Sequence, residues 1–210
     1  MSAAARRPRK RPYMDRAVNR RPIQKRFLII CQGEQTEPNY FDAFRNPRLV
    51  IRTVSAPRNP SRVVETALRL REQSEQPFDQ VWCVFDCDDT PAADFNRALQ
   101  LAASNRIEVA YSNQAFELWY LLHFQAVSGA LHRAQYIQRL EKHLGHGYQK
   151  NSPRLYNELL GLQSQAIERA RQLLESYNPP DPFHDDPSTT VHRLVEQLNR
   201  SRIISPVPER

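Results

Sequence analysis

Residues 81–89 read VWCVFDCDD, an apolar run that ends in a cluster of carboxylates. Positions 81–85 are apolar or aromatic throughout, which is typical of a strand buried on both faces of a parallel sheet. Asp86, Asp88 and Asp89 follow at the carboxyl end of this predicted strand. Ligands of open parallel sheets bind beyond that end of the strands, so the stretch predicts a fold class and a site together.

The flanking sequence repeats this alternation of short apolar runs with helical patterns. Strands are predicted at 27–31, 49–54 and 107–111, and helices at 38–45, 63–71 and 92–104. Such a β-α-β order predicts an α/β fold with a Rossmann-like parallel sheet of about four strands flanked by helices.

The second half of the chain is mostly helical by pattern. Helices are predicted at 114–125, 132–143, 153–160, 163–177 and 188–200. In the closing helix Val191, Leu194, Val195 and Leu198 share one face, so this helix should dock on the body of the protein. We therefore expect one domain over 23–210, with an α/β part at 23–112 and a helical part at 113–210.

The positive charge is concentrated near the amino terminus. Residues 6–26 hold ten Lys and Arg against one acid, Asp15, so this segment carries about +9 and the rest of the chain about −2. Residues 1–22 lack a periodic apolar face, which predicts a disordered basic arm. The arm is either an electrostatic contact to nucleic acid or a solubilising tail. The candidate contacts are Arg6, Arg7, Arg9, Lys10, Arg11, Arg20, Arg21, Lys25 and Arg26.

Composition also bears on location and on the cysteines. No run approaches the roughly 18 apolar residues of a membrane span, and no apolar core follows the basic amino terminus as in a signal peptide. We expect a cytoplasmic protein without a membrane partner. Cys31, Cys83 and Cys87 lie in or beside apolar runs, which favours reduced core thiols over a disulfide or a zinc site.

The acids at the strand ends favour a metal site. In extended backbone Asp86 and Asp88 point to the same side, and their hard oxygen ligands suit Mg²⁺ or Mn²⁺. A second polar cluster, residues 32–37 (QGEQTE), follows the first predicted strand. The alternative is that Asp89 or Thr90 caps the next helix, which explains one acid but not three adjacent ones.

Residues 115–124 (AFELWYLLHF) are apolar except for Glu117 and His123, which predicts a buried helix. A buried carboxylate is costly unless it is paired, so Glu117 either supports the site or forms a buried salt bridge with an arginine. His123 is either a support residue or a core histidine. Their spacing of six residues places them on different faces of the helix.

Together the stretches FLIICQGEQTEPNYFDAF, VWCVFDCDD, VAYSNQAFELWYLLHF and PSTTVHRLVEQL resemble the RloB family of bacterial proteins. That family is related to Toprim domains, which bind Mg²⁺ through an acid after the first strand and an Asp-x-Asp motif after the third. The resemblance implies that Asp86 and Asp88 are that pair. It also implies a role in phage defence and abortive infection, often beside an ATPase of the ABC or AAA type.

One position departs from the family pattern. Where the family has a Glu after the first strand, this chain has Gln32, and an amide cannot exchange a proton in general acid/base catalysis. Glu34 and Glu37 lie close enough in sequence to substitute for it.

Three functions stay open. They are a Mg²⁺-dependent nuclease acting on DNA or RNA, a noncatalytic nucleic-acid-binding or regulatory subunit, and an effector held by a partner ATPase.

Overall fold

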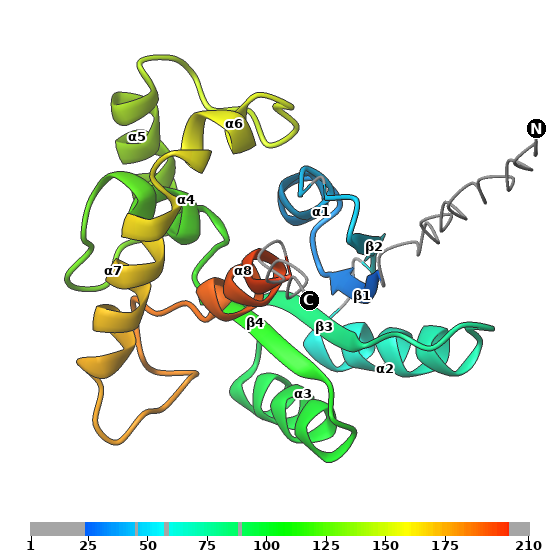
Figure 1. The fold of residues 1–210 in the computed structure, drawn as a ribbon. Helices are drawn as coiled ribbons and strands as arrows, with labels where there is room; N and C mark the ends of the chain where they lie inside the picture. The colour runs from blue at the N-terminus through cyan, green and yellow to red at the C-terminus, as the bar shows by residue number, and fades with distance from the viewer. Residues whose placement is uncertain (1–23, 45, 57–58, 88–89, 202–210) are drawn as a thin grey trace, which may run out of the picture.

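A parallel sheet of four strands organises the described part of the protein (Figure 1). The computed structural model describes residues 24–44, 46–56, 59–87 and 90–201. The strands are β1 (Lys25–Cys31), β2 (Leu49–Ser55), β3 (Gln80–Cys87) and β4 (Glu108–Asn113). Their order across the sheet is β2-β1-β3-β4, and every neighbouring pair is parallel.

The strand order creates a topological switch point at β1. The chain first leaves β1 for β2 on one side and later returns to β3 on the other side. The register pairs Cys31 with both Ser55 and Val84, and Asp86 with Ser112, so the carboxyl ends of the strands share one edge. A crevice between β1 and β3 at that edge is where ligands bind in open α/β sheets.

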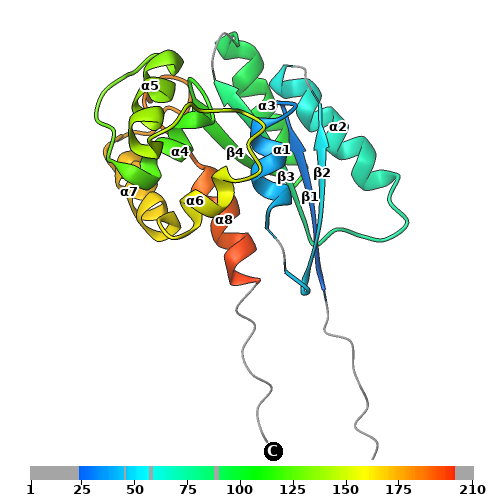
Figure 2. The same cartoon turned by 90° about the horizontal axis from the view of Figure 1, so that it is seen from above.

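Helices cover both faces of the sheet (Figure 2). The helices α2 (Pro60–Glu72) and α3 (Ala92–Ser104) lie on one face, where they pack on Leu28 and Ile30. The helices α1 (Thr36–Asp42) and α8 (Val191–Arg200) lie on the other. Because side chains alternate along a strand, Phe27 and Ile29 point to this second face. Each predicted strand and helix is present, with bounds that shift by a few residues.

The helical half is built around α4 (Glu117–Phe124), which packs against α5 (Arg133–Leu144) and α7 (Gln163–Glu175). A short helix, α6 (Leu155–Leu160), joins the latter two. All residues of α4 from Glu117 to His123 are buried, as expected for a helix that is apolar nearly all round. In the described part of the chain, no helix is long and apolar enough to cross a bilayer.

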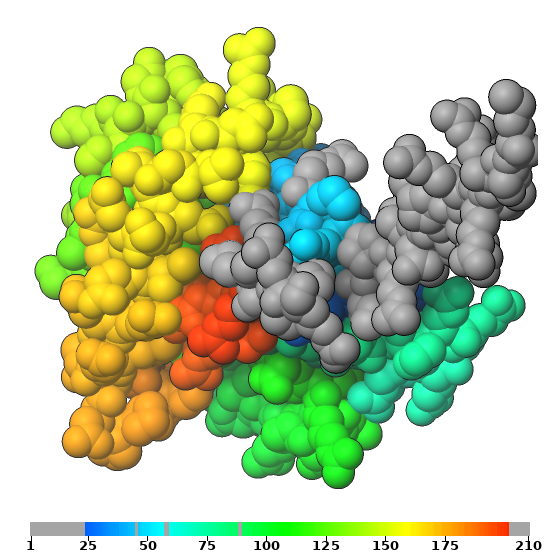
Figure 3. Space-filling view, viewed as in Figure 1, coloured from blue at the N-terminus to red at the C-terminus, as the bar shows by residue number. Residues whose placement is uncertain are grey.

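The last helix docks as predicted. Val191, Leu194, Val195 and Leu198 are fully buried. Figure 3 shows α8, in red, in contact with the orange and yellow segments that include α7. The segment before α8 fastens it to β4, where the backbone amide of Asn113 donates to the carbonyl of Ser188 at 2.7 Å.

The structure corrects two sequence predictions and confirms a third. β3 runs to Cys87, so Asp86 belongs to the strand itself. The N-cap of α3 is Pro91, without a side-chain cap, so the predicted cap at Thr90 is wrong, and Asp89 lies outside the described residues. Cys31, Cys83 and Cys87 are free, buried thiols, as predicted.

Candidate active site

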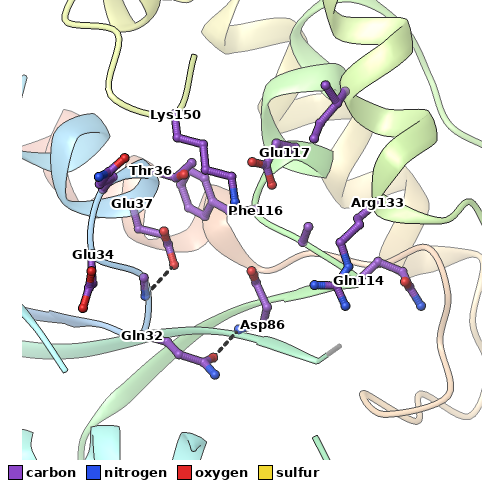
Figure 4. Close-up of a pocket in the computed structure, with 14 residues that line it drawn as sticks. Gln32, Glu34, Thr36, Glu37, Asp86, Gln114, Phe116, Glu117, Arg133 and Lys150 are labelled. Atoms are coloured by element: carbon purple, nitrogen blue, oxygen red, sulfur yellow. Dashed lines mark hydrogen bonds between the residues drawn. The ribbon is translucent and has the colours of Figure 1, made fainter. Parts of the chain in front are cut away.

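A cleft of about 400 Å³ opens at the carboxyl ends of β1, β3 and β4 (Figure 4). Its walls come from the β1–α1 turn, the end of β3, the start of α4, the start of α5 and the loop between α5 and α6. The residues that line it are Gln32, Gly33, Glu34, Gln35, Thr36, Glu37, Asp86, Gln114, Ala115, Phe116, Glu117, Arg133, Ile137 and Lys150. The switch point therefore holds most of the acids predicted from sequence.

The turn after β1 is shaped around Glu37. The backbone amide of Gly33 donates to Oε1 of Glu37 at 3.1 Å, and the Glu37 side chain is buried. A β-carbon at position 33 would lie 2.1 Å from the Glu37 carboxylate, so this close approach requires glycine. Glu34 is exposed and lies at the margin of the cleft, apart from the other carboxylates (Figure 4).

Gln32 joins the first strand end to the third. Its side-chain carbonyl accepts a hydrogen bond from the backbone amide of Asp86 at 3.0 Å. The carboxylate of Asp86 points into the cleft (Figure 4). The amide at position 32 thus fixes the backbone beside Asp86, a role that sequence patterns do not predict.

Glu37 contributes a buried carboxyl group to the lining of the cleft. Burial raises its pKa above the ordinary value, and the nearby charge of Glu117 acts in the same direction. Hydrogen bonds from the amides of Glu37 and Gly33 and the charge of Lys150 partly oppose this rise. A carboxyl whose pKa is moved toward neutrality suits proton transfer.

Glu117 enters the cleft from the first turn of α4. It is buried, and its Oε1 accepts a hydrogen bond from the Tyr148 hydroxyl at 2.9 Å. Burial and the charge of Glu117 raise the pKa of that hydroxyl, so it stays a donor at neutral pH. Of the two sequence interpretations, support of the site fits this position. The arginine salt bridge expected as the alternative is replaced by a tyrosine hydrogen bond.

Two basic residues line the same cleft. Arg133, half-buried, comes from the first turn of α5, and Lys150 comes from the loop between α5 and α6. Figure 4 shows the Lys150 side chain running down between Glu37 and Glu117, and Arg133 pointing toward Gln114. Sequence analysis missed Arg133, Tyr148 and Lys150, because they lie outside the strand-end motifs and nothing in their spacing links them to the acids.

Gln114 closes the β4 side of the cleft with an unusual backbone. Its φ of +68° lies in the left-handed region, which costs a residue other than glycine about 1 kcal/mol or more. Asn113 Nδ2, from the preceding residue, donates to the carbonyl of Asp185 at 3.1 Å. The segment before α8 thus supports this wall.

The other predicted site residues fall in different places. His123 is fully buried outside the cleft, with Nδ1 2.9 Å from the carbonyl of Trp119, as the core-histidine interpretation predicts. Burial lowers its pKa to about 4. Lys25 and Arg26 begin β1, at the opposite end of the strand from the cleft.

Several predicted residues lie outside the described residues. They are Asp88 and Asp89 of the acidic cluster, and the arm residues Arg6, Arg7, Arg9, Lys10, Arg11, Arg20 and Arg21. Among the residues that are described, no group of three or more His, Cys, Asp or Glu converges to hold a metal ion. Asp86 is thus the member of the predicted Asp-x-Asp pair whose place is known.

The comparison with protein families agrees with the motifs at this cleft. The model of the RloB-like proteins matches residues 27–198, which cover the sheet, the cleft and α4 to α7. The chain belongs to the RloB-like family. No curated protein and no solved structure matches it. For this RloB-like chain the predicted Toprim-like α/β architecture is present, with a four-stranded parallel sheet between helices.

Proposed function

We propose that this RloB-like chain is a divalent-cation-dependent phosphodiesterase that acts on nucleic acid, with the cleft as its active site. The observation that carries this proposal is the charge pattern of the lining. Four carboxylates, Glu34, Glu37, Asp86 and Glu117, share the cleft with two cations, Arg133 and Lys150. Acids that hold a metal ion beside bases that hold a phosphate are the two halves of a phosphodiester site.

The charge balance explains why a cation is needed. The described residues of the lining carry a formal charge of −2 when every acid is ionised. A phosphodiester is itself an anion, so the cleft repels it until a divalent ion compensates this charge. The negative charge of the lining therefore makes a cation necessary for substrate binding, whichever acid serves as the base.

The donor set suits Mg²⁺ or Mn²⁺. The described lining offers carboxylate, amide and hydroxyl oxygens and contains neither cysteine nor histidine, so soft-metal sites are disfavoured. Mg²⁺ keeps several waters and needs only one or two carboxylates plus substrate phosphate, so an incomplete protein ligand set is compatible with it. Asp86 would hold the ion, with Asp88 as the second ligand predicted from sequence. When bound, the ion would stabilise charge on the phosphate and acidify a water molecule.

The chain's own residues would do the rest. Glu37, buried and held by Gly33, is the best candidate for the acid/base residue, because its pKa is raised toward neutrality. Glu34 is a weaker candidate, because it is exposed at the margin. Glu117 would support the site as the partner of Tyr148.

A second function, nucleic-acid binding without cleavage, is favoured by one observation. Gln32 stands where the family pattern has a Glu, and its side chain is engaged with the Asp86 amide. On this hypothesis Gln32 holds the cleft in shape and no acid there exchanges a proton. The role in phage defence, the ATPase partner and the cytoplasmic location rest on the sequence resemblance and composition, and they stay proposals.

A cleavage assay tests the proposal. Purified protein is incubated with end-labelled DNA and RNA in Mg²⁺ or Mn²⁺, beside Asp86→Asn, Glu37→Gln and the control Asp42→Asn, an exposed acid outside the cleft. We expect cleavage by the parent and by the control, and a loss of about 10²-fold or more in the other two. Nucleic-acid binding without cation-dependent cleavage by the parent would favour the second function.

A further inference from the structure

The loop between α5 and α6, residues 145–154, is fixed to the site by Tyr148. The backbone amide of Tyr148 donates to Oε1 of Glu141 at 2.9 Å, and the Tyr148 hydroxyl donates to Oε1 of Glu117, also at 2.9 Å. Its ring also contacts that of Tyr120, with centroids 6.3 Å apart. The loop is therefore held against α4 and α5, and it is part of the wall of the cleft.

Lys150 follows two residues after this anchor. Its side chain lines the cleft between the carboxylates of Glu37 and Glu117 (Figure 4). Both carboxylates are buried, with 4% and 5% of their surface exposed, whereas Lys150 as a whole is exposed. The charge of Lys150 partly opposes the rise in the pKa of Glu37. A flexible side chain that reaches from solvent toward two buried acids can also swing toward another anion.

A divalent ion in the cleft and the Lys150 ammonium would have the same electrostatic effect. Each compensates the negative lining of the cleft, so each weakens the need for the other. Once an ion is bound, the Lys150 ammonium is no longer needed to compensate the negative charge of the lining. A phosphate oxygen of the substrate is then the natural new partner for it.

We propose that Lys150 balances the Glu37–Glu117 pair in the free protein and contacts the substrate phosphate once a divalent cation occupies the cleft. This inference rests on the proposed function and adds the phosphate-binding residue to it. Tyr148 is a positioning residue, because it holds the loop that carries Lys150. Phosphate selectivity would then come from a loop that the acidic motifs do not include.

Calorimetric titration of two small probes tests this exchange. Mn²⁺ is titrated into the free protein, and inorganic phosphate into the Mn²⁺-loaded protein. For Lys150→Gln we expect Mn²⁺ to bind about two- to fivefold more tightly, because a competing positive charge is gone. Phosphate should bind about 10- to 100-fold more weakly, because a charge-assisted hydrogen bond is lost. These shifts of opposite sign cannot arise from a damaged fold.

Three further variants sharpen the result. Lys150→Arg should keep both affinities within about threefold, and the exposed Lys142→Gln, outside the cleft, should change neither. Tyr148→Phe should weaken phosphate binding without tightening Mn²⁺ binding, because it frees the loop and leaves the charge in place. If Lys150→Gln weakens both probes together, or leaves phosphate affinity unchanged, the inference is wrong.

Hydrolysis of bis(p-nitrophenyl) phosphate separates this inference from the proposed function. Opposite shifts in affinity without hydrolysis by the parent would support the role of Lys150 and reject the phosphodiesterase. Hydrolysis with no change in KM for Lys150→Gln would reject Lys150 and keep the phosphodiesterase. A parent that binds no Mn²⁺ would reject both.

Discussion

The side-chain carbonyl of Gln32 accepts a hydrogen bond of 3.0 Å from the backbone amide of Asp86. This bond ties the end of β1 to the metal-binding candidate on β3, across the switch point of the sheet. Position 32, where the sequence resemblance implies a Glu, therefore has a structural role in this chain. Substitutions at Gln32 can separate that role from the charge that a Glu would bring.

Gln32→Leu removes the acceptor, and Gln32→Glu keeps it. Leaving the half-buried amide of Asp86 unpaired should cost about 1 kcal/mol in the free energy of unfolding, measured by urea denaturation. Gln32→Glu keeps the bond, so without metal it should lose only the cost of one added repelling charge. It should bind Mn²⁺ more tightly, because it adds a negative charge to the cleft. Equal stability and equal Mn²⁺ affinity in all three proteins would show that this bond does not organise the site.

The two glycines Gly33 and Gly161 form a matched pair for alanine substitution. Gly33→Ala places a β-carbon 2.1 Å from the carboxylate of Glu37, whereas an added β-carbon at Gly161 meets no atom within 4 Å. Because the Glu37 carboxylate can rotate, Gly33→Ala should cost only about 1 kcal/mol in stability, yet it should lower any cleavage rate strongly. Gly161→Ala should change stability by less than about 0.5 kcal/mol. Full activity of Gly33→Ala would argue against Glu37 as the acid/base residue.

Glu37 gives the stability of the protein a particular pH dependence. Its pKa is raised in the folded state, chiefly by burial, so between the ordinary and the raised value the folded state binds more protons than the unfolded state. This group's contribution to stability is therefore complete below about pH 4 and is lost as the pH rises through the raised pKa. Glu37→Gln removes the effect.

The difference in the free energy of unfolding between Glu37→Gln and the parent should therefore depend on pH. Glu37→Gln should match the parent near pH 4 and be the more stable protein at pH 7 in chemical denaturation without metal. Mn²⁺ should narrow the gap at pH 7, because it favours the ionised cleft. A gap that is constant with pH would mean that Glu37 ionises normally.

The amino-terminal arm should govern the salt dependence of nucleic-acid binding. Residues 1–22 contain eight Lys and Arg and one Asp. Deleting them should reduce the slope of log K against log salt by up to about 7, if each basic residue neutralises one phosphate. The thermal midpoint should barely move, since β1 begins at Lys25. Filter binding over a range of salt concentrations measures the slope, and an unchanged slope would reject the arm as a contact.

Local sequence patterns were enough to predict the fold and to bring together the described acids of the cleft. Short apolar runs such as 81–85, and the apolar residues that share one face of α8, indicate which segments are buried. The sheet and its flanking helices could therefore be predicted. Asp86, Glu37 and Glu117 lie in the cleft because strand ends converge at one edge of a parallel sheet.

The basic half of the site could not be predicted in the same way. Tyr148 meets Glu117 from 31 residues away, through a loop without periodicity. Lys150 is a lysine in a polar segment, which in sequence looks like any solvated surface residue. The role of Gln32 was also hidden, because a side chain that bonds to backbone 54 residues away leaves no local pattern.

The central claim, that the cleft holds a divalent cation through Asp86, is tested most directly by thermal unfolding with and without Mn²⁺. At a concentration of about 100 times Kd, bound Mn²⁺ should add about 2.7 kcal/mol of stability. That gain should raise Tm of the parent by roughly 5–10 °C in a chain of this size. Asp86→Asn should show little of this gain, and its Tm without metal should equal or exceed that of the parent, because one of several repelling carboxylates is neutral. An equal rise in both proteins would place the ion elsewhere, and no rise in the parent would contradict the account.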